Sequence, residues 1–126
     1  MPAISAVPRT ADEAVVVTKA VLRAADRLGV TSRLLAGTLG LSEATVSRMG
    51  SGAYLLTPGD KPFELAVLSL RLFRSLDAIV GGDQTAARAW LRSQNTVLGA
   101  APISLIPTLA GLVNVVGYLD ARRALV

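Results

Sequence analysis

Apolar residues recur at helical spacing along nearly the whole chain, and no segment alternates apolar and polar residues as a half-buried strand does. The first periodic segment covers residues 11–28. It opens on the acidic pair Asp12–Glu13, which favours a helix amino terminus, and it stops at Gly29. We therefore predict an all-α protein whose first helix follows a disordered arm over residues 1–10.

Two short helices are predicted next, each behind a residue that can cap it. Thr31 and Ser32 can cap a helix that runs to about Thr38. Ser42 can cap a third helix, which ends at the glycines of residues 50–52. The stretch AYLLTPGDKP, residues 53–62, then interrupts the helical pattern with proline and glycine and reads as a linker.

The second half of the chain predicts four more helical pieces. A long helix starts near Pro62 and ends at a glycine pair, and Asp83 opens a further helix that contains Trp90. A loop leads to a short turn at Pro102, and Thr108 begins the terminal helix. The predicted organisation is thus a first domain over residues 11–57 and a second over residues 62–126.

Residues 32–52 have the spacing of a helix-turn-helix. Such a unit needs a small residue where its helices cross, a turn residue that tolerates positive φ four positions later, and apolar side chains on both helices. Ala36 and Gly40 meet the first two requirements. The apolar residues are Leu35, Leu39, Leu41, Val46 and Met49.

In a DNA-binding helix-turn-helix the start of the second helix reads base edges, and other residues hold phosphates. The candidate DNA-contacting residues are Arg33, Ser42, Thr45, Ser47 and Arg48. The alternative is a helical hairpin of the same shape that contacts no DNA. Of the net charge of +4, residues 1–60 contribute only +1, from six basic and five acidic side chains, so strong DNA binding is not expected.

Composition agrees with helices and excludes several kinds of chemistry. Of the 126 residues 52% are hydrophobic but only 4% aromatic, which favours helices of Ala, Val and Leu over a β-sandwich. With no cysteine and no histidine, there are no disulfides, no thiolate or imidazole metal sites and no catalysis by either residue. We expect no enzymatic activity and no cofactor. The lack of cysteine is compatible with a reducing cytoplasm.

Residues 90–123, WLRSQNTVLGAAPISLIPTLAGLVNVVGYLDARR, resemble the toxin-binding domain of Xre/ParS-type antitoxins, which partner RES-domain toxins. The family's pattern is met by Trp90, Leu91, Asn95, Leu98, Pro102, Leu105, Ile106, Thr108, Gly111, Val115, Tyr118 and Leu119. The resemblance, including the small helix-turn-helix before this domain, extends over most of residues 30–123. It implies an antitoxin whose carboxyl-terminal region lies across the active site of a toxin that uses NAD.

The terminal helix has apolar residues on two of its faces, which agrees with a role in binding a partner. Leu109, Leu112, Val116 and Leu119 are predicted to share one face, whereas Val113 and Tyr118 lie off it and form a second apolar face. A helix that is apolar on two sides suits the groove of a partner. The candidate toxin-contacting residues are Leu98, Pro102, Leu105, Ile106, Leu109, Leu112, Val113, Val116, Tyr118, Leu119, Arg122 and Arg123.

Arg122 and Arg123 lie in the last turn of this helix and have two interpretations. They can simply complement the carboxyl-terminal helix dipole. Under the resemblance, one of them occludes the NAD pocket of the toxin. A membrane span is a further alternative, because no charge lies between Arg92 and Asp120, but Pro102 and Pro107 break that stretch, so we expect none.

The leading hypothesis is an antitoxin that binds a RES-domain toxin, forms homodimers and hetero-oligomeric complexes, and represses its own operon by binding operator DNA. The alternative is a stand-alone helix-turn-helix regulator with a carboxyl-terminal dimerisation domain. A regulator should bind DNA alone with salt-dependent affinity, whereas an antitoxin should bind the product of a neighbouring gene tightly.

Overall fold

The computed structural model describes the backbone of residues 2–125 and the side chains of residues 11–125. Within these residues it is built of helices, with one isolated β-bridge between Asn95 and Ala100, which confirms the predicted all-α fold. The helices are α1 (Pro2–Arg27), α2 (Ser32–Leu39), α3 (Glu43–Ser51), α4 (Lys61–Ile79), α5 (Gln84–Arg92), α6 (Pro102–Leu105) and α7 (Leu109–Arg123).

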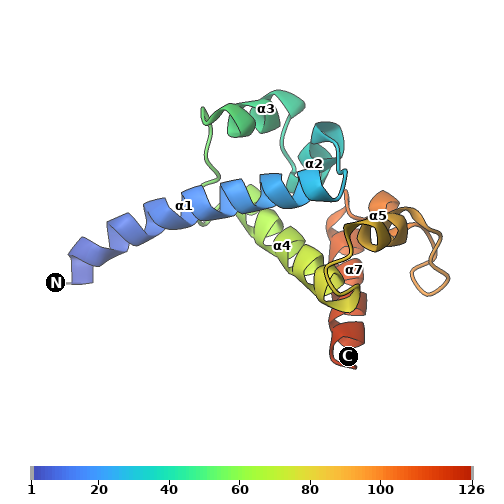
Figure 1. The fold of residues 1–126 in the computed structure, drawn as a ribbon. Helices are drawn as coiled ribbons and strands as arrows, with labels where there is room; N and C mark the ends of the chain where they lie inside the picture. The colour runs from blue at the N-terminus through green and yellow to red at the C-terminus, as the bar shows by residue number, and fades with distance from the viewer. Residues whose placement is uncertain (1, 126) are drawn as a thin grey trace.

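The start of α1 differs from the prediction. The helix begins at Pro2, so it covers most of the segment for which the sequence predicted a disordered arm, residues 1–10. Extending an existing helix adds one hydrogen bond per residue without a new nucleation step, and α1 is already anchored further along by its packed residues. Figure 1 shows its amino-terminal end lying away from the other helices.

Four helices begin at the capping residues that the sequence predicted. The side-chain oxygens of Thr31, Ser42, Asp83 and Thr108 each accept a hydrogen bond from the backbone N–H three residues later, over 3.2, 3.1, 3.1 and 3.0 Å. Each such bond satisfies one of the free N–H groups of a first helical turn and stabilises the helix by about 1 kcal/mol. These caps fix where α2, α3, α5 and α7 start.

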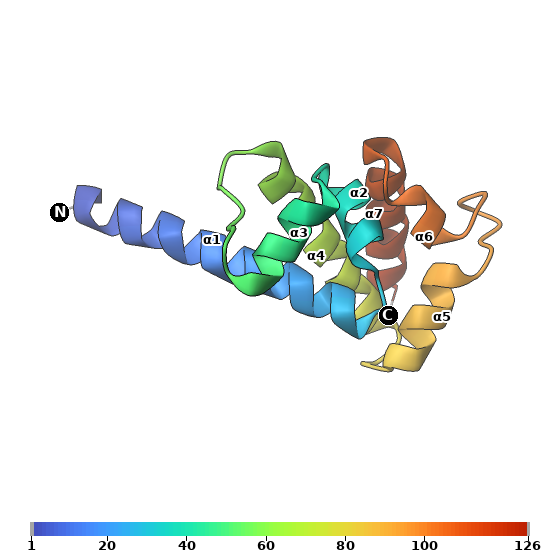
Figure 2. The same ribbon diagram turned by 90° about the horizontal axis from the view of Figure 1, so that it is seen from above.

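The helices share one core, and α4 lies at its centre (Figure 2). This helix packs against α1 and α2 on one side and against α7 on the other. Its Leu72 and Leu76 are fully buried and belong to the same hydrophobic core as Val21 of α1 and Leu119 of α7. The linker at residues 53–62 therefore does not separate two independent cores, since α4 contributes to both predicted domains.

Two arginines of α5 bind the carboxyl end of α1. Arg88 Nε donates to the carbonyl oxygen of Arg27 over 2.7 Å. Arg92 Nη2 donates to the carbonyl oxygens of Leu28 and Gly29 over 3.1 and 2.8 Å. A helix carboxyl end presents unpaired carbonyls and partial negative charge, so guanidinium groups are well matched to it. This contact ties the carboxyl-terminal half of the chain to its first helix.

Candidate functional site

The α2–α3 pair has the geometry that its spacing predicted. Ala36 is buried at the crossing, and Gly40 ends α2 in the left-handed region with φ of 69°. The predicted apolar contacts are also found, with Leu35, Leu39, Val46 and Met49 buried and Leu41 half-buried. Figure 1 shows α3 on the outside of the molecule, beyond α1 and α2. The helix-turn-helix therefore presents one face of α3 to solvent.

Three of the predicted DNA-contacting side chains at α3, those of Ser42, Thr45 and Arg48, are linked to one another. Ser42, Ser47 and Arg48 are exposed, and Thr45 is half-buried. The Thr45 hydroxyl lies 2.9 Å from the Ser42 hydroxyl and accepts a 3.0 Å hydrogen bond from Arg48 Nη2. This holds the guanidinium group along the helix while leaving further N–H donors free for a phosphate or a base.

An acidic residue lies beside this row. Arg33 of α2 and Glu43 of α3 approach to 4.0 Å, with side chains 90% and 62% exposed. An ion pair so exposed contributes little to stability. It does reduce the positive charge available to phosphates, which agrees with the weak basic character of this half of the sequence.

The four leucine and valine residues that were predicted to share one face of α7 are not equally buried. Leu112, Val116 and Leu119 are buried together with Val115, but Leu109 is 59% exposed. The start of α7 packs through Gly111. Residues two positions apart on a helix point in directions about 200° apart, so the contact at Gly111 turns Leu109 outward.

Gly111 is the position where α7 meets the turn before it. A Cβ atom there would overlap the carbonyl oxygen of Leu105 and lie 2.8 Å from Thr108 Oγ1. Gly111 therefore allows a close approach, here by the backbone of the same chain. Only glycine fits, because the α6–α7 turn rests directly on the helix backbone.

The twelve predicted toxin-contacting residues fall into three groups by exposure. The buried ones are Pro102, Ile106, Leu112, Val116 and Leu119. The half-buried ones are Leu98, Leu105 and Tyr118, and the exposed ones are Leu109, Val113, Arg122 and Arg123. The buried group belongs to the core of this chain, so these five side chains are not accessible to a partner in this structure.

The carboxyl end of α7 is held by contacts that sequence reasoning missed. Tyr118 stacks on Trp90 of α5, with ring centroids 6.1 Å apart and planes 21° apart, and Arg122 Cζ lies 5.3 Å from the Tyr118 centroid. Asp120 forms a 2.7 Å ion pair with Arg71 and accepts a 3.1 Å hydrogen bond from Ser75, both on α4. The last turn, with its two arginines, thus has a defined orientation.

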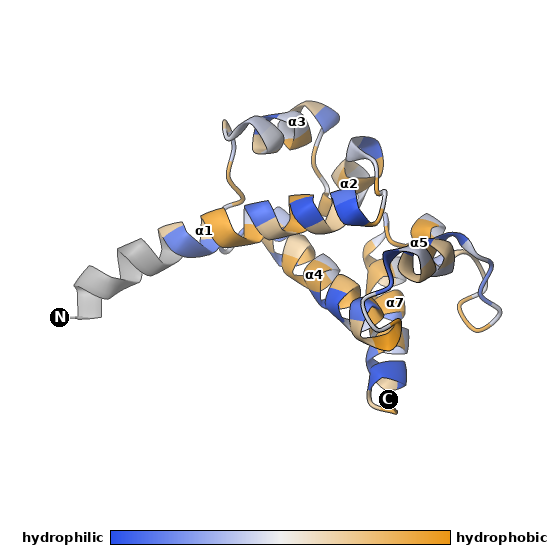
Figure 3. Cartoon of the chain, viewed as in Figure 1, coloured by the Kyte–Doolittle hydropathy of each residue, from blue (hydrophilic) through white to orange (hydrophobic). Residues whose placement is uncertain are grey.

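The loop between α5 and α6 is also ordered, and it carries an exposed valine that the sequence did not single out. Asn95 Oδ1 accepts hydrogen bonds from the backbone N–H groups of Val97 and Leu98, both over 3.0 Å, and these bonds hold the turn. Val97 is 75% exposed. Figure 3 shows the loop extending from the body with an apolar tip.

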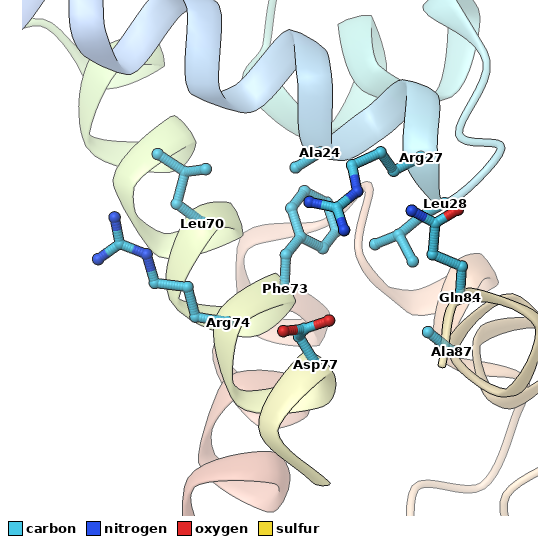
Figure 4. A pocket seen from close by; sticks show the side chains of 9 residues that line it. All are labelled: Ala24, Arg27, Leu28, Leu70, Phe73, Arg74, Asp77, Gln84 and Ala87. Atoms are coloured by element: carbon cyan, nitrogen blue, oxygen red, sulfur yellow. The ribbon is translucent and has the colours of Figure 1, made fainter. Parts of the chain in front are cut away.

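A cavity of about 160 Å³ opens between α1, α4 and α5. Phe73 and Leu70 contribute apolar surface, and Figure 4 shows Arg27 and Asp77 pointing into this space while Arg74 points away. The side chains that the structure describes include no group of three residues able to hold a metal ion. None of the described helices is long and apolar enough to cross a membrane.

Two protein-family models match the chain. The one described as the antitoxin Xre-like helix-turn-helix domain matches residues 8–71. The one described as the antitoxin Xre/MbcA/ParS C-terminal toxin-binding domain matches residues 75–124. The boundary between the two matches lies inside α4, the helix that packs against both halves. A comparison with curated proteins found no similar sequence.

Proposed function

Since this chain belongs to the Xre-type antitoxin family, we propose that it neutralises a RES-domain toxin by laying the carboxyl end of α7 across the toxin's active site. The observation that supports this most directly is the anchored, outward-facing end of α7. Asp120 is bonded to α4 while Arg122 and Arg123 remain exposed. A tip that is already ordered loses less conformational entropy when a partner binds it.

The proposed toxin-contacting surface combines exposed apolar residues with these arginines. Leu109 and Val113 lie one turn apart on α7 and are 59% and 48% exposed. Val97 adds a third exposed apolar side chain within the matched toxin-binding domain. Apolar anchors with flanking arginines are typical of protein interfaces, where they supply most of the binding free energy.

Of the two arginines, we assign the pocket-occluding role to Arg123. Arg122 is already stacked on Tyr118, whereas Arg123 forms no ion pair with the side chains that the structure describes. A guanidinium group has five N–H donors and matches a pocket lined by carboxylates. Arg123 can therefore enter a toxin pocket without first giving up a contact within this chain.

The test starts from the product of the adjacent gene, which we expect to be a RES-domain protein. A chain that ends after Asp120 keeps the bonds to Arg71 and Ser75, so α7 stays anchored while both arginines are removed. We expect this chain to bind the toxin but to leave NAD turnover largely active. Full silencing of NAD turnover by the shortened chain would show that the arginines do not occlude the pocket.

Variants separate the two arginines. Arg123→Ala should restore NAD turnover in the complex, whereas Arg122→Ala should have the smaller effect. Arg74→Ala, an exposed arginine on α4, is the matched control and should leave neutralisation unchanged. If the adjacent product does not bind at all, the stand-alone regulator is the better description.

We further propose that homodimers bind operator DNA through α3 and that the toxin complex represses its own operon in the cytoplasm. Paired half-sites suit a dimer of helix-turn-helix domains. The support is the free face of α3, with Arg48 held along it. A mobility-shift titration at several salt concentrations, with and without toxin, tests this proposal, and the absence of binding in both conditions would refute it.

A further inference from the structure

A groove of about 540 Å³ separates the amino-terminal part of α2 from the end of α5, the short helix α6 and the α6–α7 turn. Figure 1 shows α2 and α5 next to the carboxyl end of α1. We call it the α2–α5 groove, and its lining includes Thr31, Arg33, Leu34, Arg92, Ile103 and Pro107. The groove therefore joins residues of the matched helix-turn-helix domain to residues of the matched toxin-binding domain.

Arg92 is the cation that the toxin-binding domain contributes to this groove. Its guanidinium group donates three hydrogen bonds, to the carbonyl oxygens of Leu28, Gly29 and Arg88. A guanidinium group has five N–H donors, so two remain for a ligand. Arg92 is exposed and forms no ion pair with the side chains that the structure describes. The three carbonyls thus fix the position of its charge, and no carboxylate cancels it.

The α2–α5 groove adjoins the end of α3 at which a helix-turn-helix reads DNA. Arg33, which lines the groove, lies 4.0 Å from Glu43, the first residue of α3. In such a unit the second helix enters the major groove by its amino-terminal end, while the first helix crosses the phosphate backbone. The first helix of this unit is α2. The backbone beside the major groove therefore passes along the part of α2 where the α2–α5 groove opens.

We propose that the α2–α5 groove binds the phosphate backbone of duplex DNA and that Arg92 contacts a phosphate from within the toxin-binding domain. The inference rests on the operator binding proposed above and adds to it a contact outside the helix-turn-helix. Arg33 supplies a second cation, and the exposed Thr31 hydroxyl supplies a neutral partner for a phosphate oxygen. Ile103 and Pro107 offer apolar surface to the sugars.

The distribution of charge along the chain favours such a contact. Residues 1–60 contribute +1 of the net charge of +4, so residues 61–126 contribute +3 (4 − 1). The α2–α5 groove and α3 together carry three arginines and one glutamate, a net charge of +2 (3 − 1). They are Arg33, Arg48, Arg92 and Glu43. Because DNA affinity depends on the phosphates that a protein neutralises, Arg92 compensates for the few basic residues of the first domain.

The charges beside the groove do not cancel this sum. Asp26 and Arg27, at the end of α1, offset each other in formal charge. Arg88 lies against them, with its guanidinium group bonded to their carbonyl oxygens, and adds one positive charge. The junction of α1, α2 and α5 is therefore basic, as a surface that binds phosphates has to be.

The salt dependence of DNA affinity tests the contact. Each phosphate that a cationic side chain neutralises steepens the plot of log affinity against log salt concentration by about one. Arg92→Gln should make this slope shallower by about one and weaken binding severalfold at low salt, whereas Arg92→Lys should keep the native slope. Phosphate contacts carry no sequence information, so the loss should be equal on the duplex upstream of this chain's gene and on a duplex of random sequence.

Arg88→Gln is the matched control, because Arg88 also binds the carboxyl end of α1 but does not line the groove. A loss of DNA affinity caused by a loosened α1 would appear in both variants. We expect the shallower slope in Arg92→Gln and an unchanged slope in Arg88→Gln. Circular dichroism and thermal denaturation compare the folding of the two variants with that of the native chain.

Three results would overturn the proposal. Equal salt slopes for the native and Arg92→Gln chains would refute the contact and leave operator binding through α3 in place. A native chain that binds neither duplex, with or without toxin, would refute the operator binding itself and this contact with it. If Arg92→Gln weakens only the complex with the toxin, the α2–α5 groove binds the toxin and not DNA.

Discussion

The helix-turn-helix pair and the terminal helix are held in place by neighbours at very different distances along the chain. The contacts between α2 and α3 come from residues 32–52, within a few turns of each other. The orientation of α7 is set by α4, as in the hydrogen bond from Ser75 to Asp120, which joins residues 45 positions apart. Local spacing was therefore enough to interpret the first region but not the second.

The substitution with the largest expected effect on stability tests which side of α7 is packed into the core. Leu119→Ala removes a fully buried side chain and should lower the free energy of unfolding by about 3 kcal/mol. Leu109→Ala, on the exposed side, should change stability by less than about 0.5 kcal/mol. Urea denaturation measures both, and equal losses would show that the face of α7 is assigned wrongly.

Gly111→Ala should have the next largest effect and lower the free energy of unfolding by about 2 kcal/mol, because the added methyl group would overlap the Leu105 carbonyl. Gly117 of the same helix is the matched control, since a Cβ there meets no atom within 4 Å. Gly117→Ala should raise stability by about 0.5–1 kcal/mol through helix propensity alone. Thermal denaturation distinguishes the two, and a stabilised Gly111→Ala chain would contradict the close approach.

Asp120→Asn should have a smaller effect, because it removes the charge from the pair with Arg71 while its shape is kept. We expect the free energy of unfolding to fall by about 1 kcal/mol at most, since the Arg71 side chain is 63% exposed and solvent screens the ion pair. Inhibition of the toxin should weaken measurably, because the carboxyl end of α7 loses its ion pair with Arg71. Unchanged inhibition would show that this ion pair is not needed for neutralisation.

Arg48→Ala should have the smallest effect on stability, within about 0.5 kcal/mol, since its side chain bonds only to the surface hydroxyl of Thr45. DNA affinity should nevertheless fall severalfold, and its dependence on salt should become shallower by about one phosphate contact. A salt-dependent mobility-shift titration checks this. An unchanged salt dependence would exclude Arg48 from the DNA contact.

The features that the sequence predicted well are those settled within a few residues. The caps Thr31, Ser42 and Thr108 form because a side-chain oxygen reaches an N–H three positions away, whatever the rest of the fold does. Asn95 orders its loop for the same reason. The match to a family model likewise confirms that residues 90–123 belong to an Xre/MbcA/ParS-type toxin-binding domain.

The candidate site was harder to predict because nearly every residue of α7 before Asp120 is apolar or small, apart from Asn114 and Tyr118. Such a helix has no polar face that shows which side is buried. Leu109 was grouped with Leu112, Val116 and Leu119 on one face, but it is exposed while they are buried. The contact of Tyr118 with Trp90 was missed. Both depend on how α7 lies against α4, α5 and the preceding turn.

By itself, the sequence determined the number and order of the helices after α1, most of their starting points and the helix-turn-helix, since these rest on hydrogen bonds and spacing within single segments. Only the tertiary structure decided which apolar side chains of α7 enter the core and which face solvent. It also joined the two predicted domains through α4. Burial is a property of contacts between distant segments, and a uniformly apolar helix takes its buried side from whatever packs against it.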